Sequence, residues 1–595
     1  MKTLGIIGRI VLALGMCLSL PASRGQAQPY LQTDDPQAKA EALLAEMTPE
    51  ERVGQLFLVT FDGNQFDSTS AISSLISRYH VGGVVLTAAN DNFVDGDGTV
   101  SAAHHLTESL QRIEWDITHP SGSESDPAQP ASGAYIPLLI GVSQNGDGYP
   151  NDQILDGLTP LPSLMSIGAT WQTALAERVG RTLGRELEAL GINLLLGPSL
   201  DVLDPQYGGD GGGLGANTFG SDPYWTQELG KEYISGIHVG GQGRLAVVAK
   251  HFPGQGGSDR NPETEVATVR KSLEQLKQIE LAPFLAVTSN PQNTSTIADG
   301  FLVSHIRYQG FQGNIRETTR PVSLDKSAVD ELMALPEFLN WHQSGGVLIS
   351  DNLGSQSVRR FYDTIGQAFD SRLVARDAFL AGNDLLYVDD FISGTDPDSF
   401  TSITKTLDYF TTKYRDDPAF AQRVDDSVRR ILTLKYRLYP SFEIDQVLPD
   451  EKNLGFIKNS NDVTLDVARN AVTLISPTTA SDLESLIAAP PSSSDRILFI
   501  TDTLTGVQCS TCMTSSGLTV DALQSAVLRL YGPGAGGQVN EGRLVSYSFE
   551  DLINVLNYVE SPTNEPYPLE SDLQRAQWVI FSALNETNDR PASQA

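Results

Sequence analysis

The residues best suited to chemistry in this sequence follow a series of apolar segments. Lys250 ends the segment RLAVVAK, and His251 follows it, before a loop rich in glycine and carboxylates. Ser350 ends another segment, GGVLIS, and Asp351 follows it. A cation, an imidazole and a carboxylate can bind polar ligands, transfer protons or attack an electrophilic carbon. Their shared position, after apolar segments, indicates a site on one rim of a sheet.

Two neighbouring segments end in the same way. Ser304 and His305 close GFLVSHI, and Asp201 follows INLLLG in the stretch GPSLDVL. Taken singly, each residue is better explained as a polar group that satisfies the end of a strand than as a catalytic group. The convergence of four neighbouring segments favours a common site instead.

The elements that must position these residues are short apolar runs separated by helical patterns. The runs lack clean alternation, which is typical of strands buried on both faces of a parallel sheet. Eight such units predict a (β/α)8 barrel, with a doubly wound open sheet as the alternative. The eight runs occupy residues 54–60, 82–87, 136–142, 192–197, 244–250, 300–306, 345–350 and 384–390.

The chain divides into a large and a small unit. We predict a barrel over residues 28–440, with residues 89–133 as a polar insertion. A polar linker over 441–463 then leads to a smaller, incomplete α/β layer domain over 464–595, in which a helix enters an apolar strand at 464–476.

The N-terminus has the pattern of an export signal. Lys2 and Arg9 precede an apolar run, and the small residues Gly25 and Ala27 mark a cleavage site. Residues 1–27 are therefore predicted to be a signal peptide, and the protein to be secreted or periplasmic. No later segment is long and apolar enough to span a membrane.

The charge and the cysteines narrow the range of partners. The 595-residue chain has a net charge of -32, which disfavours nucleic acid and anionic membranes. The sequence does not define an oligomeric state. In an exported chain, Cys509 and Cys512 favour a short disulfide over a zinc site, which would need further ligands. A redox motif is the remaining alternative.

Several motifs together resemble glycoside hydrolase family 3. They are IPLLIGVSQNGDG, LPSLMSIGATWQTALAERVG, TFGSDP, AVVAKHFPGQG, SHIRY, GGVLISDNLG and AGNDLLYV, in the order of that family. The resemblance is closest to the β-N-acetylhexosaminidase branch. It implies a retaining glycosidase that cleaves terminal β-linked sugars, with N-acetylhexosamine as the best candidate and no metal or organic cofactor.

The resemblance also implies roles for individual residues. Asp351 matches the nucleophile, and Lys250 and His251 match the pair that holds sugar hydroxyls. Asp201, His305 and Ser143 are expected to complete the substrate-binding set.

The general acid/base is harder to assign. The branch uses an Asp-x-His pair in the loop after KHFPG, and this loop contains no histidine. An ungapped alignment places Glu263 at the histidine position, and we predict that Glu263 is the acid/base. Asp259 and Glu265 are alternatives, and in a β-glucosidase-like enzyme the second domain would supply Glu541 or Glu550.

Two departures from the family concern sugar binding. An Asp-x-Glu-Gly-Gly run is replaced by Ser143-Gln144-Asn145-Gly146-Asp147, and an arginine is replaced by Asn217. Asp147, Arg260 or Arg307 are candidates to compensate. Because charged hydrogen bonds are the stronger ones, these losses leave open a β-glucosidase-like enzyme or a non-catalytic carbohydrate-binding relative.

Overall fold

The structure is a computed structural model. It describes residues 35–119, 133–146, 148–206, 213–366, 368–487, 489–557, 567–584 and residue 592. The predicted signal peptide, residues 1–27, lies outside these ranges.

Eight parallel strands close into a barrel, with β10 pairing with β1 through Phe57 and Leu386. Each strand overlaps one of the eight predicted runs, with β4 and β5 extending two residues beyond theirs, which confirms the barrel and excludes the open sheet. The strands are β1 (Phe57–Val59), β2 (Gly83–Val85), β3 (Leu139–Val142), β4 (Leu194–Ser199), β5 (Ala246–Phe252), β7 (Gly300–Val303), β9 (Val347–Ser350) and β10 (Leu385–Val388).

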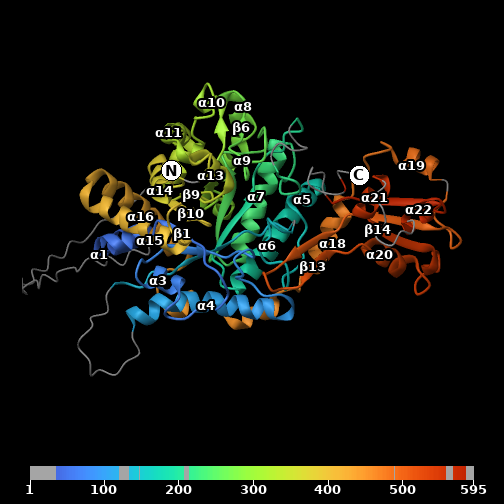
Figure 1. Ribbon diagram of the computed structural model, residues 1–595, viewed down its shortest axis with the longest axis horizontal. Helices are drawn as coiled ribbons and strands as arrows, with labels where there is room; N and C mark the ends of the chain where they lie inside the picture. Colours follow the sequence, from blue (N-terminus) through green and yellow to red (C-terminus); the bar gives the residue numbers. More distant parts are fainter. Residues whose placement is uncertain are drawn as a thin grey trace, which may run out of the picture.

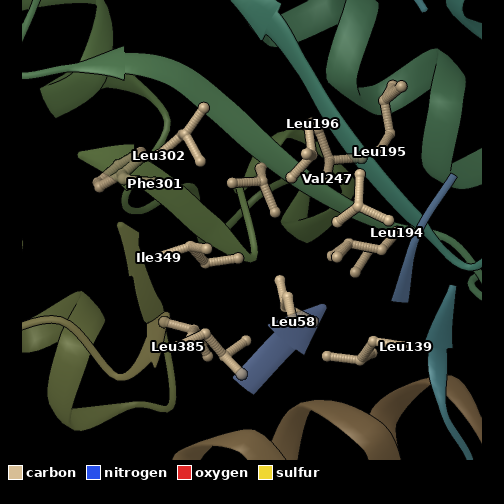
Figure 2. Close-up of a cluster of buried hydrophobic side chains, with 14 of the residues drawn as sticks. Leu58, Leu139, Leu194, Leu195, Leu196, Val247, Phe301, Leu302, Ile349 and Leu385 are labelled. Carbon is tan, nitrogen blue, oxygen red and sulfur yellow. The ribbon is translucent and has the colours of Figure 1, made fainter. Parts of the chain in front are cut away.

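The barrel interior is filled with aliphatic side chains. Figure 2 shows Leu58, Leu139, Leu194 and Leu385 meeting from four different strands. All four are buried, as are nearly all residues of the barrel strands. Because the interior is packed rather than hollow, a ligand site has to lie at the strand ends and in the loops.

Helices surround the barrel (Figure 1), and small residues allow them to pack closely. One of them is α6 (Thr173–Ala189), and Gly191 follows its end with a φ of +78°. It packs against α7 (Pro223–Gly240). A Cβ at Gly180 would lie 2.1 Å from the Tyr233 carbonyl oxygen, so only glycine permits this approach.

The prediction of an insertion at 89–133 was wrong for residues 99–118. Residues 99–118 form α4 (Thr99–Thr118), the barrel helix between β2 and β3. Its buried face includes Leu106 and Leu110, and the Thr107 hydroxyl donates to the Leu190 carbonyl oxygen at 2.6 Å. Because the stretch contains many polar residues, the apolar face of this helix was not recognised in the sequence. Residues 120–132 lie outside the described part of the chain.

The second domain is a small layered α/β unit, as predicted. Its parallel sheet has the order β14 (Leu544–Ser548), β11 (Ile497–Thr501), β15 (Trp578–Ser582). Alternate residues of β11 face opposite sides: Phe499 packs toward α20 (Ala522–Tyr531), and Ile500 toward α21 (Phe549–Leu556) and α22 (Pro568–Leu573). A separate hairpin joins β12 (Leu504–Val507) and β13 (Thr514–Leu518).

The region between the domains differs from the prediction in two ways. The stretch expected to be a polar linker packs on the barrel through the buried Val447, and Arg244 binds the Gln446 carbonyl oxygen at 2.6 Å. The expected strand at the end of 464–476 is absent. After α18 (Asn461–Ala471), residues 472–476 are exposed and belong to none of the described sheets.

Further elements complete the described chain. They are α1 (Pro36–Glu46), α2 (Pro49–Gly54), α3 (Ala71–Ser77), α5 (Leu164–Thr170), β6 (Thr268–Val269), α8 (Leu273–Gln278), α9 (Leu281–Ala286), β8 (Arg307–Tyr308), α10 (Gln309–Gln312), α11 (Lys326–Met333), α12 (Pro336–Gln343), α13 (Gln356–Tyr362), α14 (Ser371–Ala381), α15 (Ser399–Asp416), α16 (Pro418–Leu438), α17 (Ile444–Val447) and α19 (Ala480–Leu486). None of the helices in the described ranges has the length and apolar character needed to cross a bilayer.

Candidate active site

The end of β5 supplies the basic side of the site. Lys250 and His251 are the fifth and sixth residues of this fully buried strand, and both are largely buried. The Lys250 ammonium donates to the Ser143 hydroxyl oxygen at 3.0 Å, which joins β5 to the loop after β3. The barrel thus holds a cation at the rim against a neutral partner.

Asp201 lies beneath His251 and orients its ring. Its carboxylate is fully buried and accepts from His251 Nδ1 at 2.7 Å, from the His251 backbone N–H at 3.2 Å and from the Gln255 N–H at 2.6 Å. Because a carboxylate only accepts, Nδ1 carries the proton and Nε2 is left for a ligand. Burial alone would raise the pKa of Asp201, but His251 and these hydrogen bonds lower it overall. Asp201 is therefore a positioning residue rather than a sugar ligand, which corrects the expected substrate-binding role.

The end of β9 supplies the carboxylate predicted to be the nucleophile. The Asp351 N–H donates to the Val303 carbonyl oxygen at 3.0 Å, which continues the ladder with β7 and fixes the backbone. Its carboxylate oxygen Oδ1 accepts from the Asn352 N–H at 2.8 Å. The side chain is half-buried, so a rigid strand end presents it to a ligand.

His305 supports this segment from behind. It is buried, with Nε2 2.9 Å from the Asn352 carbonyl oxygen and Nδ1 2.7 Å from the Ser323 hydroxyl. A carbonyl only accepts, so Nε2 carries the proton. Burial lowers the pKa of His305 and keeps the ring neutral. Since both nitrogens contact the protein, the expected substrate-binding role is not supported, and His305 instead positions the backbone beside Asp351.

The loop after β5 brings Glu263 to the same place. Its glycines fit closely: a Cβ at Gly256 would lie 1.8 Å from the Val202 carbonyl oxygen. Further along, the Ser357 N–H at the start of α13 donates to the Glu263 carbonyl oxygen at 3.3 Å. Side-chain atoms of His251, Glu263 and Asp351 all lie within 4.8 Å of one another.

The surroundings of Glu263 favour its protonated form. The residue is exposed to solvent, but a carboxyl oxygen lies within 4.8 Å of ligand atoms of both Asp351 and His251. Burial of the carboxyl among protein groups, and then the charge of Asp351, raise the pKa of Glu263 against the opposing charges of His251 and Lys250. Contact with solvent moderates the first effect, and a sugar that displaced this solvent would strengthen it.

This arrangement can carry out acid-assisted nucleophilic chemistry. A fixed carboxylate, a carboxyl group whose pKa is raised and two basic groups converge on one rim of the barrel, at the ends of β5 and β9 and in the loop after β5. The same three side chains offer one ligand atom each to a cation. Paired carboxyl groups of unequal pKa are the pattern of enzymes that cleave glycosidic bonds.

Comparison with known proteins gives the family. The sequence profile described as "Glycosyl hydrolase family 3 N terminal domain" matches residues 48–434. This chain belongs to glycosyl hydrolase family 3. The prediction of a glycosidase is thereby confirmed at the level of the family.

The relatives of this family 3 chain are distant. It is 26% identical over 453 residues to a protein of Cellulomonas fimi named β-N-acetylglucosaminidase/β-glucosidase, covering 76% of this chain and 68% of that protein. It is 26% identical over 262 residues to a β-hexosaminidase of Hydrogenovibrio crunogenus, covering 43% of this chain and 66% of the relative. The chain thus spans about two thirds of these relatives.

A solved structure shows the same fold across both domains. The family 3 β-N-acetylglucosaminidase from Paenibacillus sp. str. FPU-7 matches with a TM-score of 0.64 at 20% identity, covering 90% of this chain and 84% of that one.

The positions where this family 3 chain departs from its branch carry neutral side chains. Ser143 contacts Lys250, and its hydroxyl also donates to the Asn151 carbonyl oxygen at 2.9 Å. Asn145 and Asn217 are buried and have side-chain atoms without hydrogen-bond partners in the described structure. Ser143 and Asn145 stand where the branch has acidic residues, and Asn217 stands where it has an arginine, so all three positions are uncharged here.

The residues proposed to compensate are engaged elsewhere or undescribed. Arg260 pairs with Asp259 and Glu265 on the exposed loop. Arg307 donates to the backbone carbonyl oxygens of Thr319 and Glu317. Asp147 lies outside the described residues.

The alternative acids lie in other surroundings. Asp259 accepts from the Thr268 N–H at 2.9 Å, and Glu265 pairs with Arg260 and Arg360, so both help to anchor the loop. Glu541 and Glu550 are exposed residues of the second domain, next to β14. Of the described candidates, Glu263 is the one grouped with Asp351.

Sequence reasoning missed a carboxylate at the end of β10. Asp389 Oδ1 accepts from the Thr60 hydroxyl at 2.7 Å and from Asn90 Nδ2 at 3.3 Å, residues that follow β1 and β2. Burial, then the charges of Asp389, Asp351 and Glu263, raise the pKa of Tyr387. The signal was available, because the run DLLYVDD ends in acids as the other strands end in polar groups.

Proposed function

We propose that this protein is a retaining glycosidase that cleaves terminal β-linked sugars. One observation carries the proposal: oxygen atoms of Asp351 and Glu263 lie within 4.8 Å of each other. Retaining glycosidases place their carboxyl groups about 5–5.5 Å apart, whereas inverting enzymes separate them by about 6.5–9.5 Å to admit water.

The residues divide the reaction between them. Asp351 attacks the anomeric carbon to form a glycosyl-enzyme while Glu263 protonates the departing oxygen. Ionised Glu263 then accepts a proton from water, which attacks the same carbon and releases the sugar with its original configuration. Lys250 donates to one sugar hydroxyl and His251 Nε2 accepts from another, and Asp201 holds the imidazole in the orientation that permits this.

The leading substrate is a β-linked N-acetylhexosamine. The resemblance of the motifs to that branch supports this choice, as do the names of the two relatives. The name of the Cellulomonas protein also includes β-glucosidase activity, which supports β-glucosides as the second candidate. Neutral Ser143 and Asn217 keep a third possibility open, a binding protein that retains the barrel without turnover.

A panel of aryl glycosides tests the proposal. The wild type should release phenol from β-N-acetylglucosaminides, and proton NMR should show the β-anomer as the first product. Asp351→Asn should lower kcat by at least about a hundredfold with an unchanged melting temperature, because the covalent step is lost. The matched control Asp390→Asn alters an exposed acid beside the site and should retain activity.

Three results would count against the proposal. Residual activity of Asp351→Asn above about a hundredth would reject the nucleophile. A first product of α-configuration would reject retention. No turnover of any glycoside by the wild type, with measurable sugar binding by calorimetry, would favour the binding protein.

We also propose that the protein works outside the cytoplasm. The basic start, apolar run and small-residue site at residues 1–27 support export, and the cysteine pair is compatible with an oxidising compartment. N-terminal sequencing of protein from the extracytoplasmic fraction should begin at Gln28, and an intact Met1 on the active protein would contradict this.

A further inference from the structure

The hairpin of the second domain reaches the barrel at the side of the sugar site. Between β12 and β13, residues 508–513 form a tip that is closed by a disulfide between Cys509 and Cys512. In Figure 1, β13 extends from the orange and red domain toward the barrel. The tip contacts the loops that follow β2 and β3, which are two of the loops on the rim that carries the site.

Gln508 makes the central contact. Its side chain is fully buried, Oε1 accepts from the Leu155 N–H at 2.6 Å, and Nε2 donates to the Gln153 carbonyl oxygen at 2.7 Å. The hairpin also packs closely here, since a Cβ at Gly506 would lie 2.7 Å from Leu155 Cδ1. A buried amide that satisfies two backbone groups fixes the segment it binds, because leaving those groups unpaired is costly.

The tip is held on the other side by two acids of the loop after β2. Asp91 accepts from the Ser510 N–H at 2.5 Å and from its hydroxyl at 2.6 Å, and Asp95 accepts from the Met513 N–H at 3.1 Å. The Ser510 hydrogen bonds lower the pKa of Asp91. The disulfide therefore closes a turn whose backbone groups are used for docking.

The segment held by Gln508 is folded back on the active site. The Gln153 N–H donates to the Ser143 carbonyl oxygen at 3.2 Å, and Gln144 Oε1 accepts from the Ile154 N–H at 3.1 Å. The Ser143 hydroxyl binds the Asn151 carbonyl oxygen and receives the Lys250 ammonium. A continuous series of hydrogen bonds thus runs from Gln508, through residues 151–154, to Lys250.

We propose that the disulfide-closed hairpin positions the sugar site, and that Gln508 is the positioning residue through which it acts on Ser143 and Lys250. This inference rests on the proposed function, because Lys250 is the group that would hold a sugar hydroxyl. Loss of Gln508 frees the loop after β3, so Ser143 no longer fixes the ammonium. Substrate binding weakens, while Asp351 and Glu263, held by β9 and α13, keep their geometry.

The test compares full-length variants on an aryl β-N-acetylglucosaminide. Gln508→Ala should raise KM about tenfold, with kcat within about twofold, which corresponds to the loss of one or two hydrogen bonds. Gln508→Glu, which keeps an acceptor but loses the donor, should give an intermediate KM. Joint substitution of Cys509 and Cys512 by serine should raise KM in the same direction. The control Met513→Ala alters an exposed side chain of the same tip and should change neither constant.

A double-mutant cycle then asks whether Gln508 acts through Ser143. In a Ser143→Ala background, Gln508→Ala should raise KM by less than about twofold, because the contact between the Ser143 hydroxyl and Lys250 is already absent. Independent effects that multiply, or an unchanged KM in Gln508→Ala, would overturn the inference.

The inference can fail separately from the proposed function. If the wild type turns over no glycoside, the proposed function fails. Hydrogen exchange of the amides over residues 143–156 then tests whether the hairpin positions this loop. Faster exchange there in Gln508→Ala than in Met513→Ala supports positioning of the loop, and equal exchange overturns it.

Discussion

The two carboxyl groups of the site owe their different roles to their positions. Asp351 is held by a strand end and faces two basic groups, whereas Glu263 arrives on a loop beside a second negative charge. The negative charge of Asp351 within 4.8 Å disfavours ionisation of Glu263, and its pKa is raised in part for this reason. Under the proposed function, this glutamate would take the place of the histidine in the branch that this chain resembles.

Glu263→Ala should separate the two halves of the reaction. An aryl glycoside with an acidic phenol needs no protonation to depart, so the glycosyl-enzyme should still form and accumulate. A poorly activated glycoside should lose about a hundredfold or more in kcat/KM. Burst kinetics on both substrates, with added azide to accelerate release, measure these effects. Equal losses on both substrates and no azide effect would instead point to Asp259 or Glu265.

The pH profile should carry the signature of the same group. Because Glu263 must be protonated in the first step and its pKa is raised, kcat/KM should fall as the pH rises through that elevated value. In Glu263→Gln, kcat/KM for a substrate with a good leaving group should lack this alkaline limb. An alkaline limb unchanged in the variant would assign it to another residue, and Glu265→Gln serves as the control on the same loop.

At the scale of elements, the strand ends of the barrel carry two kinds of polar side chain: those that face the site and those that hold the first kind in place. Strands β5 and β9 place Lys250, His251 and Asp351, while Asp201 and His305 sit one layer below and bind backbone and imidazole groups. A strand-end polar residue can thus be a ligand or a support. The sequence pattern is the same for both, and the hydrogen-bond partners distinguish them.

His305→Ala should show which of these roles His305 has. As a support for Asn352, its loss should lower kcat about tenfold with little change in KM, because Asp351 shifts while Lys250 and His251 remain. His305→Gln offers an N–H in place of Nε2 and should restore part of kcat. A rise in KM alone would return His305 to the substrate-binding set.

Much of the barrel could be predicted from the sequence, and the reason is local. Each barrel strand is a short apolar run, and the end of each run marks the rim, so Asp351, Lys250 and His251 were predictable. Contacts between distant segments leave no such pattern: nothing local in Gln508 or Asp91 indicates that they meet. The helix α4 and the exposed residues 472–476 were mistaken because burial depends on neighbours as well as on composition.

At the scale of the whole molecule, one buried carboxylate connects barrel segments that lie far apart in the sequence. Asp384 is fully buried at the start of β10, next to the seam with β9. Its carboxylate accepts from Arg430 at 2.8 Å and Ser427 at 2.7 Å on α16, and from His342 at 3.0 Å on α12. One carboxylate therefore connects the last barrel helix, an earlier helix and the closing strand.

Asp384→Asn should destabilise the barrel by about 3–5 kcal/mol, because it leaves arginine charges without their buried partner. Asp330→Asn breaks an exposed pair with Lys326 and should cost about 1 kcal/mol or less. Urea unfolding in a Trp578→Phe background, where every remaining tryptophan belongs to the barrel, measures both values.

The effect of Asp384 should also depend on pH with a defined sign. Burial would raise the pKa of Asp384, but Arg430, His342 and Arg423 hold it well below the ordinary value. A carboxyl with a lowered folded pKa stabilises the protein above the unfolded value of about 3.9, and this contribution is lost as the pH falls toward the folded pKa. The difference in stability between wild type and Asp384→Asn should therefore be constant near neutrality and shrink in acid. If the difference instead grew below about pH 4, the ionised carboxylate of Asp384 would not be the source of the stabilisation.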